Sequence, residues 1–215
     1  MKFIQITALL ALATNPLYAE DLTVAAKVGT LGLGIEGSYA FSDRWGIRAG
    51  INHLNYSFED DLDGVEYDGD LELGSITLLG DFRPWSGGFR ISGGVVLNDN
   101  RITGVADPDA TYLIDDTVYT INEVGTLSAD TDFDSVSPYL GLGYDWAITD
   151  RVDLIFDLGA LFQGDPDVAI SSVGGTLSGD PDLRADLDAE EAFYREDLEE
   201  YDPYLVASIG LQFRF

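Results

Sequence analysis

The sequence contains no cysteine, a single histidine, and only 11 lysines and arginines among its 215 residues. The lack of cysteine excludes a disulfide framework, a thiolate nucleophile and cysteine-ligated metal sites. The 39 aspartates and glutamates bring the net charge to −28, and so acidic a chain will not bind nucleic acid, which attracts positive charge. No internal segment approaches the roughly 20 apolar residues that a membrane-spanning helix needs.

The N-terminus has the layout of a secretory signal peptide. Lys2 precedes an apolar stretch at 3–13, and Pro16 is followed by small or tolerated residues. We expect residues 1–19 to be cleaved off, leaving an exported domain of residues 20–215 with no helical anchor. The alternative, a buried N-terminal helix, conflicts with the proline and with the absence of acidic residues.

The mature chain shows period-2 alternation of apolar and polar residues, as strands with one buried face do. In 151–162, for example, Val152, Leu154 and Phe156 alternate with Asp153 and Asp157. Short turns lie at 41–44, 83–88 and 147–151, and between them are long polar segments at 59–70, 103–134 and 164–203. Short turns on one side and long loops on the other are typical of an outer-membrane barrel.

Aromatic residues cluster beside the short turns, as they would in a girdle at a membrane interface. The cluster comprises Tyr39, Phe41, Trp45, Phe82, Trp85, Phe89, Tyr144, Trp146, Phe213 and Phe215. A soluble β-sandwich also alternates, but it would spread its aromatics through the core. The polar face here instead carries glycines and isolated charges of both signs, which favours a barrel.

Seven alternating segments are clear, but seven antiparallel strands cannot close, because the first and last would run parallel. The segments are 33–41, 45–58, 70–83, 88–102, 133–147, 151–163 and 204–215. Gly29, Gly32 and Gly34 permit a tight hairpin that would give strands at 21–28 and 32–41. The sequence therefore predicts an all-β, up-and-down transmembrane barrel of eight antiparallel strands, with one overlong first strand as the alternative.

The last residues, SIGLQFRF, alternate up to a terminal phenylalanine. Gly210, Phe213 and Phe215 resemble the C-terminal signal that the barrel-assembly machinery reads. We therefore expect this machinery, outer-membrane lipid and lipopolysaccharide as partners, and the bacterial outer membrane as the location.

Charged residues occupy the inward positions of the predicted strands. An eight-stranded barrel has an interior just wide enough for side chains, and an unpaired buried charge is costly, so we expect these residues to form ion pairs. Two interpretations remain open: a closed, ion-paired plug, or a selectivity lining for a small cationic solute with Asp145, Asp153 and Asp157 as its attractive side. The lumen-lining set is Glu36, Arg48, Asp81, Arg83, Arg90, Asp145, Asp153, Asp157 and Arg214.

The three long polar segments carry 28 of the 39 acidic residues and only two basic ones. The negative electrostatic field of these acids concentrates cations and basic solutes at the barrel mouth. The alternative explanation is adaptation to a salty or divalent-rich medium, in which acidic surfaces stay hydrated. The tripeptide Asp-Pro-Asp at 107–109, 165–167 and 180–182 offers carboxylates to divalent cations. None of these segments has the EF-hand spacing, so we predict no specific metal site and no cofactor.

A helical pattern begins at Pro181 in the last long segment, with Leu183, Leu187, Tyr194 and Leu198 at nearly 3.6-residue spacing. We expect a short acidic helix there, either a lid over the mouth or an ordinary packed loop helix.

Enzymatic outer-membrane barrels use a histidine with a serine or an aspartate near the rim. Here the single histidine is His53, and Ser57 lies four residues further on. The two residues are roughly 13 Å apart along a strand, which is too far for a dyad. We therefore predict that the protein is not an enzyme.

Four motifs occur in order along the chain: DFRPW (81–85), SPYLGLGY (137–144), FQGDPDVAIS (162–171) and the acidic AEEAFYREDLEEYDPY (189–204). In these motifs the sequence resembles the CarO-type outer-membrane proteins, small barrels associated with carbapenem susceptibility and with uptake of basic amino acids such as ornithine. The resemblance implies an eight-stranded barrel without a wide open pore, in a family whose channel activity is disputed. From the charged lumen and the acidic mouth we predict a narrow channel favouring small cationic solutes such as basic amino acids. The alternative is a closed structural or surface-interaction barrel without transport.

Overall fold

The computed structural model describes residues 22–62, 65–106, 111–115, 117–199 and 203–215. The expected signal peptide and the tripeptide at 107–109 lie outside the described residues. The elements are β1 (Leu22–Gly29), β2 (Gly32–Ala40), β3 (Trp45–Leu62), β4 (Val65–Phe82), β5 (Phe89–Asn98), β6 (Arg101–Ala106), β7 (Thr111–Ile114), β8 (Thr117–Thr120), α1 (Ile121–Val124), β9 (Gly125–Asp132), β10 (Val136–Ala147), β11 (Val152–Leu161), β12 (Asp167–Gly174), α2 (Pro181–Glu199) and β13 (Tyr204–Arg214).

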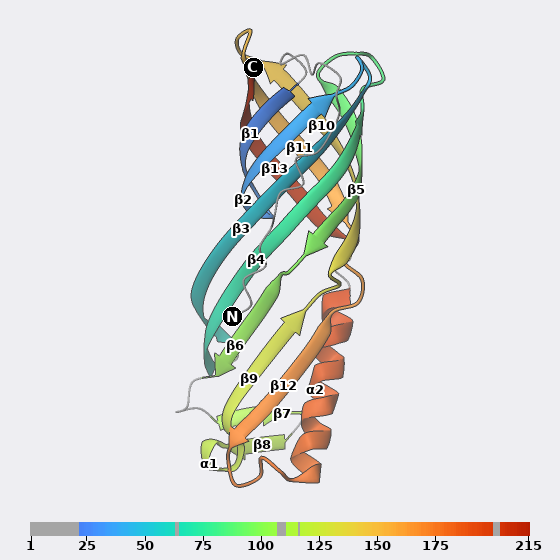
Figure 1. The fold of residues 1–215 in the computed structure, drawn as a ribbon. Helices are drawn as coiled ribbons and strands as arrows, with labels where there is room; N and C mark the ends of the chain where they lie inside the picture. Colours follow the sequence, from blue (N-terminus) through green and yellow to red (C-terminus); the bar gives the residue numbers. More distant parts are fainter. Residues whose placement is uncertain (1–21, 63–64, 107–110, 116, 200–202) are drawn as a thin grey trace, which may run out of the picture.

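Eight antiparallel strands form a closed barrel, as predicted (Figure 1). The ring runs β1, β2, β3, β4, β5, β10, β11 and β13, and β13 pairs back with β1. The predicted N-terminal hairpin is present, because Gly29 pairs with Gly32 and only two residues link β1 to β2. Gly32 has φ +96, a backbone conformation that favours glycine.

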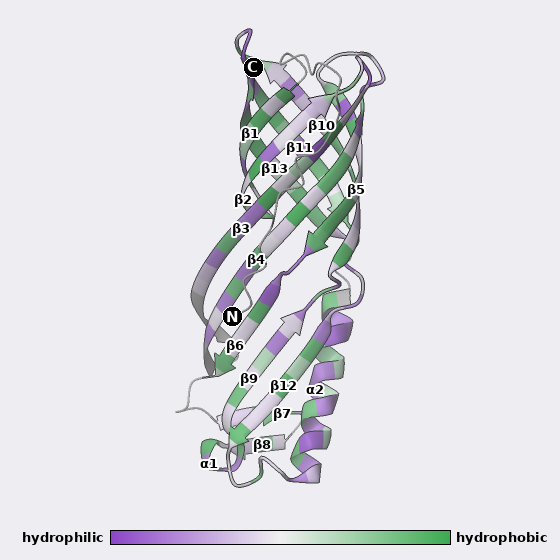
Figure 2. Ribbon diagram, viewed as in Figure 1, coloured by the Kyte–Doolittle hydropathy of each residue, from purple (hydrophilic) through white to green (hydrophobic). Residues whose placement is uncertain are grey.

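The outer face of the barrel is apolar, and its exposure to water would be energetically unfavourable. Ile35, Leu140 and Leu205 each expose about 60% of their surface, at 61%, 59% and 63%. Lipid hydrocarbon removes the cost of this exposure, which is about 25 cal/mol per Å² in water. Figure 2 shows the hydrophobic colour concentrated on the barrel strands, whereas α2 is largely hydrophilic. The protein is therefore an outer-membrane β-barrel.

The predicted aromatic girdle lies at the barrel end that carries the short turns, which is the periplasmic end in outer-membrane barrels, and the opposite end is therefore the extracellular one. The rings of Trp45 and Phe82, cross-strand partners, have centroids 4.6 Å apart. Those of Trp85 and Phe89 lie 5.3 Å apart. The C-terminal end of β13 lies at this same end (Figure 1).

In the described part of the chain, no helix has the length and apolar character that would let it cross a membrane.

The long polar segments were predicted as loops, and this prediction is wrong for much of their length. β3 and β4 stay paired from Trp45 with Phe82 to Leu62 with Val65, and β6, β9 and β12 continue the sheet from β4. The expected strand at 88–102 is interrupted at Asp99 and Asn100, and the one at 133–147 begins only at Val136. Beyond the membrane, β9 and β12 carry Asp130, Asp132 and Asp167 on the face away from their core, and this composition obscured the alternation.

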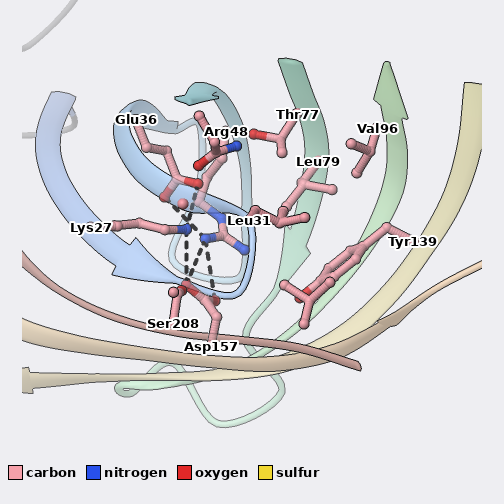
Figure 3. A pocket seen from close by; sticks show the side chains of 14 residues that line it. Lys27, Leu31, Glu36, Arg48, Thr77, Leu79, Val96, Tyr139, Asp157 and Ser208 are labelled. Atoms are coloured by element: carbon pink, nitrogen blue, oxygen red, sulfur yellow. Dashed lines mark hydrogen bonds and ion pairs between the residues drawn. The ribbon is translucent and has the colours of Figure 1, made fainter. Parts of the chain in front are cut away.

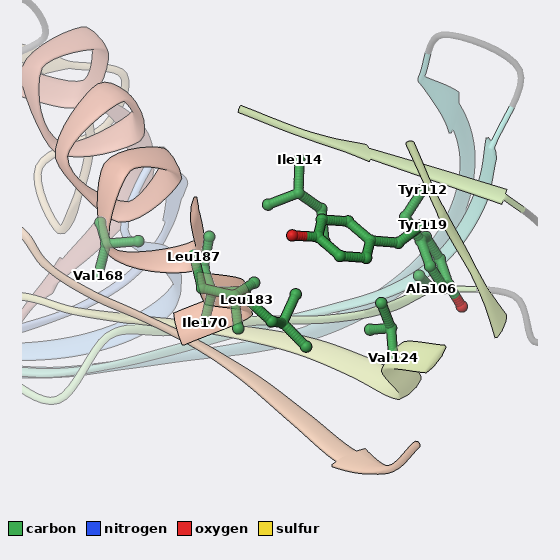
Figure 4. Close-up of a cluster of buried hydrophobic side chains, with 9 residues drawn as sticks. All are labelled: Ala106, Tyr112, Ile114, Tyr119, Val124, Val168, Ile170, Leu183 and Leu187. Atoms are coloured by element: carbon green, nitrogen blue, oxygen red, sulfur yellow. The ribbon is translucent and has the colours of Figure 1, made fainter. Parts of the chain in front are cut away.

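A hydrophobic core outside the barrel supports this extracellular sheet (Figure 4). It consists of Ala106, Tyr112, Ile114, Tyr119, Val124, Val168, Ile170, Leu183 and Leu187, all buried. Helix α2 begins at Pro181 as predicted and contributes the two leucines. The phenol of Tyr119 donates a 2.6 Å hydrogen bond to Asp186 on α2, and this bond raises the pKa of Tyr119 to about 12.

Helix α2 lies along β12 and packs on this core (Figure 1). The side chain of Asp180 accepts a 2.9 Å hydrogen bond from the backbone N–H of Asp182 and so caps the helix N-terminus. Of the two sequence interpretations, this arrangement is the ordinary packed helix and not a lid.

Candidate functional site

The barrel interior holds the charged residues that the sequence placed on the inward faces of the strands. Each of the nine takes part in an ion pair. Arg48, Asp81, Arg90 and Asp153 are almost completely buried. Strand alternation accounts for their direction, since neighbouring residues in each strand face lipid.

Arg48 and Asp157 are the centre of the largest cluster (Figure 3). Arg48 contacts Glu36 at 3.0 Å, Asp81 at 2.8 Å and Asp157 at 3.3 Å. Asp157 also contacts Lys27 at 3.1 Å and Arg90 at 2.6 Å. Two facing strands of the barrel, β3 and β11, are thereby connected through the lumen.

The cluster continues toward the periplasmic end. Asp145 pairs with Arg90 and, at 3.0 Å, with Arg83. A separate pair joins Arg214 to Asp153 at 2.6 Å, and Gln212 donates to the same carboxylate at 3.2 Å. The three aspartates that the channel interpretation treats as an attractive side are thus each bound to a basic side chain.

The predicted lumen-lining set lacks two polar members of the cluster. Lys27 contacts Glu36 at 3.0 Å, and the Ser92 hydroxyl donates to Asp81 at 2.6 Å. Lys27 had a usable signal, because it alternates with outward-facing Val24, Ala26 and Val28 on the first strand.

Glycines make room for the large inner side chains. A Cβ at Gly143 would lie 2.6 Å from Cζ of Arg90. A Cβ at Gly141 or Gly159 would collide with the phenol of Tyr139. These glycines in β10 and β11 therefore set how Arg90 and Tyr139 lie across the lumen.

An apolar layer follows the ionic layer on its extracellular side. It consists of Leu79, Val96, Tyr139, Leu161 and Val206, with Leu31 and Tyr204 packed against it. Leu31 comes from the tip of the β1–β2 hairpin. That tip is fixed to β13, because the N–H of Thr30 donates to the carbonyl of Ala207 at 2.9 Å.

Two cavities show how far water reaches. A small cavity of about 30 Å³ lies among Leu31, Tyr139 and the inner charges, which is room for about one water molecule. A wider cavity of about 450 Å³ is lined by residues near the periplasmic end, Arg83 and Arg214 among them. Between this vestibule and the extracellular half, the inner charged side chains are buried and ion-paired.

The inner face is electrically balanced. In the described residues it carries five basic and five acidic side chains, and every one of the five carboxylates contacts a base. His53 is exposed on β3, and its strand neighbours are Leu33 and Gly74. The described part of the chain holds no group of three or more His, Asp or Glu side chains placed to bind a metal.

The three residues of the expected assembly signal lie on β13 or directly after it. Phe213 and Phe215 are exposed in the girdle, at 48% and 64%. Gly210 pairs with Lys27, and a Cβ there would lie 2.7 Å from Cγ of that lysine. The glycine therefore has a packing reason as well, and its recognition by the assembly machinery stays a prediction.

No family model and no curated protein matches the sequence. Among solved structures, Acinetobacter baumannii CarO2 aligns with a TM-score of 0.63 and 23% identity, over 90% of this chain and 98% of that one. Acinetobacter baumannii CarO aligns with a TM-score of 0.61 at 23% identity, over 90% and 97%. This chain folds as a CarO-type outer-membrane barrel. At this identity the likeness extends to the CarO fold and not to individual site residues.

Proposed function

We propose that this CarO-type barrel is closed to solutes in its resting state and acts at the cell surface, where its acidic extracellular half binds cationic partners. Two layers of inner side chains support the first part of the proposal. An ion-paired layer and an apolar layer follow one another across the interior. Opening a path would uncouple buried charges, which is costly.

The charge distribution supports the second part. The inner face is neutral, whereas the segments 59–70, 103–134 and 164–203 carry 28 acidic and two basic residues. A field of one sign attracts partners of the other sign and speeds their encounter. At physiological salt it is screened beyond about 8–10 Å, so only partners that approach the extracellular sheet closely gain from it.

A narrow channel favouring small cationic solutes such as basic amino acids is the second candidate. The vestibule of about 450 Å³ favours it, because solute could reach the ionic layer from the periplasmic end. This function requires the Arg48–Asp157 contact and the apolar layer to open together.

Conductance separates the two candidates. Purified protein in a planar bilayer should give no unitary current steps, and liposomes carrying it should take up lysine no faster than empty vesicles. A general porin in the same lipid is the positive control. Cation-selective steps, or lysine uptake that exceeds alanine uptake and falls as salt rises, would overturn the closed barrel and establish the channel.

A further inference from the structure

The extracellular sheet has two edges, and one of them is capped by side chains. At the β12 edge, the N–H of Ile170 donates to Glu191 at 2.9 Å, and its carbonyl accepts from Arg184 at 3.0 Å. Arg184 and Glu191 also contact each other at 2.8 Å. Helix α2 thereby satisfies the backbone groups of Ile170 and covers this edge, so that another strand cannot pair there.

The opposite edge, on β3, is open. β2 pairs with β3 only from Gly46 to His53, since the chain turns back at Gly32. From Leu54 to Leu62, β3 is paired with β4 alone, and no other strand in the described ranges lies beside it. Nine residues of strand span about 30 Å, so this is a long edge beyond the membrane.

The backbone groups that face this edge follow from the hydrogen bonds lower in the same strand. The carbonyl of Arg44 accepts from Arg83 at the start of the β4 pairing, whereas the carbonyl of Trp45 accepts from Phe41 on the β2 side. In an antiparallel strand the N–H and C=O groups of successive residues point alternately to one neighbouring strand and to the other. The β3–β4 register continues without a break, so this alternation holds up to Leu62. The N–H and C=O groups facing the open edge are therefore those of Asn55, Ser57, Glu59 and Asp61.

We propose that a basic, extended peptide segment of a partner protein adds as a strand to the β3 edge at Leu54–Leu62. Main-chain hydrogen bonds would give such a complex its affinity, and side chains its specificity. This inference rests on the proposed surface function and identifies where and how the cationic partner binds.

Charge selects the occupant. Glu59, Asp60 and Asp61 lie on the edge strand, and Asp68 and Asp70 lie on β4 beside it. If a second copy of this chain paired at this edge, its acidic residues would lie beside the same acidic residues of the first copy. Like charges on adjacent strands are destabilising. A strand that alternates lysine or arginine with apolar residues would place its basic side chains on one face of the sheet, and their positive charge complements the acidic edge.

The test uses the full-length barrel in lipid nanodiscs and a fluorescent nine-residue peptide alternating lysine and valine. Fluorescence anisotropy should report binding, and a matched glutamate–valine peptide should not bind. Ser57→Pro removes an N–H at the open edge without removing a bond to β4. It should weaken binding about tenfold or more through lost backbone hydrogen bonds, whereas Ser57→Ala should not.

Asn55→Pro is a second variant at the same edge, and heat-modifiable mobility shows that each variant is folded. Hydrogen exchange at residues 55–61 should slow when the peptide is bound. Proline variants that bind like Ser57→Ala, while binding remains salt-dependent, would overturn strand addition and leave the surface function standing. No binding of the lysine peptide by the wild type at low salt would overturn both.

Discussion

The carboxylate of Asp157 contacts three basic side chains at once, so few substitutions of any one of these residues would be tolerated. Lys27, Arg48 and Arg90 all contact its carboxylate, and each also has one other acidic partner or more. Replacing one inner charge therefore disturbs a network and not one pair. The groups of a buried polar network polarise one another, so a change at one position affects the others.

The variant Asp157→Asn tests this network. It keeps the size of the side chain but leaves one unbalanced positive charge among buried groups, so the free energy of unfolding should fall by about 3–5 kcal/mol. Urea titration of the protein folded in lipid vesicles measures it. Asp43→Asn, in the exposed β2–β3 turn, is the control and should change little. Equal stability of the two variants would contradict a central role for Asp157.

At the scale of elements, the membrane strands were predictable and the extracellular ones were not. A strand between lipid and lumen alternates strictly, so residues 151–163 revealed β11 and its inward aspartates. β9 and β12 bury one face on a small core and present Asp130, Asp132 and Asp167 on the other. Their composition is that of a loop. The partners of Asp157 could not be predicted, because register between distant strands decides them.

We expect that the extracellular core can be destabilised while the barrel stays folded. Leu187→Ala removes a buried α2 side chain from this core, and such a cavity costs about 2–5 kcal/mol. Limited proteolysis of the vesicle-bound protein should then cut faster within 164–199, while heat-modifiable mobility still shows a closed barrel. Ala185→Ser, exposed on the same helix, should leave the cleavage rate unchanged. Loss of the folded barrel itself would show that the two cores are one unit.

For the whole molecule, the distribution of charge and aromatic residues defines an orientation. The short turns lie at one end of the barrel (Figure 1). The girdle residues Trp45, Trp85 and Trp146 lie in or beside these turns in the sequence. The sheet, α2 and nearly all of the acidic excess lie at the other end. Barrels of the outer membrane keep their short turns periplasmic, which places the acidic half outside the cell.

The absence of cysteine makes this orientation directly testable. Thr176 lies in the exposed turn between β12 and α2, and Asp150 in the exposed turn between β10 and β11. A polymer-linked maleimide too large for porins should label Thr176→Cys on intact cells, and Asp150→Cys only after the outer membrane is permeabilised. The cysteine-free parent gives the background. Labelling of Asp150→Cys on intact cells would invert the topology, and the acidic half would then face the periplasm, where it could bind no partner from outside the cell.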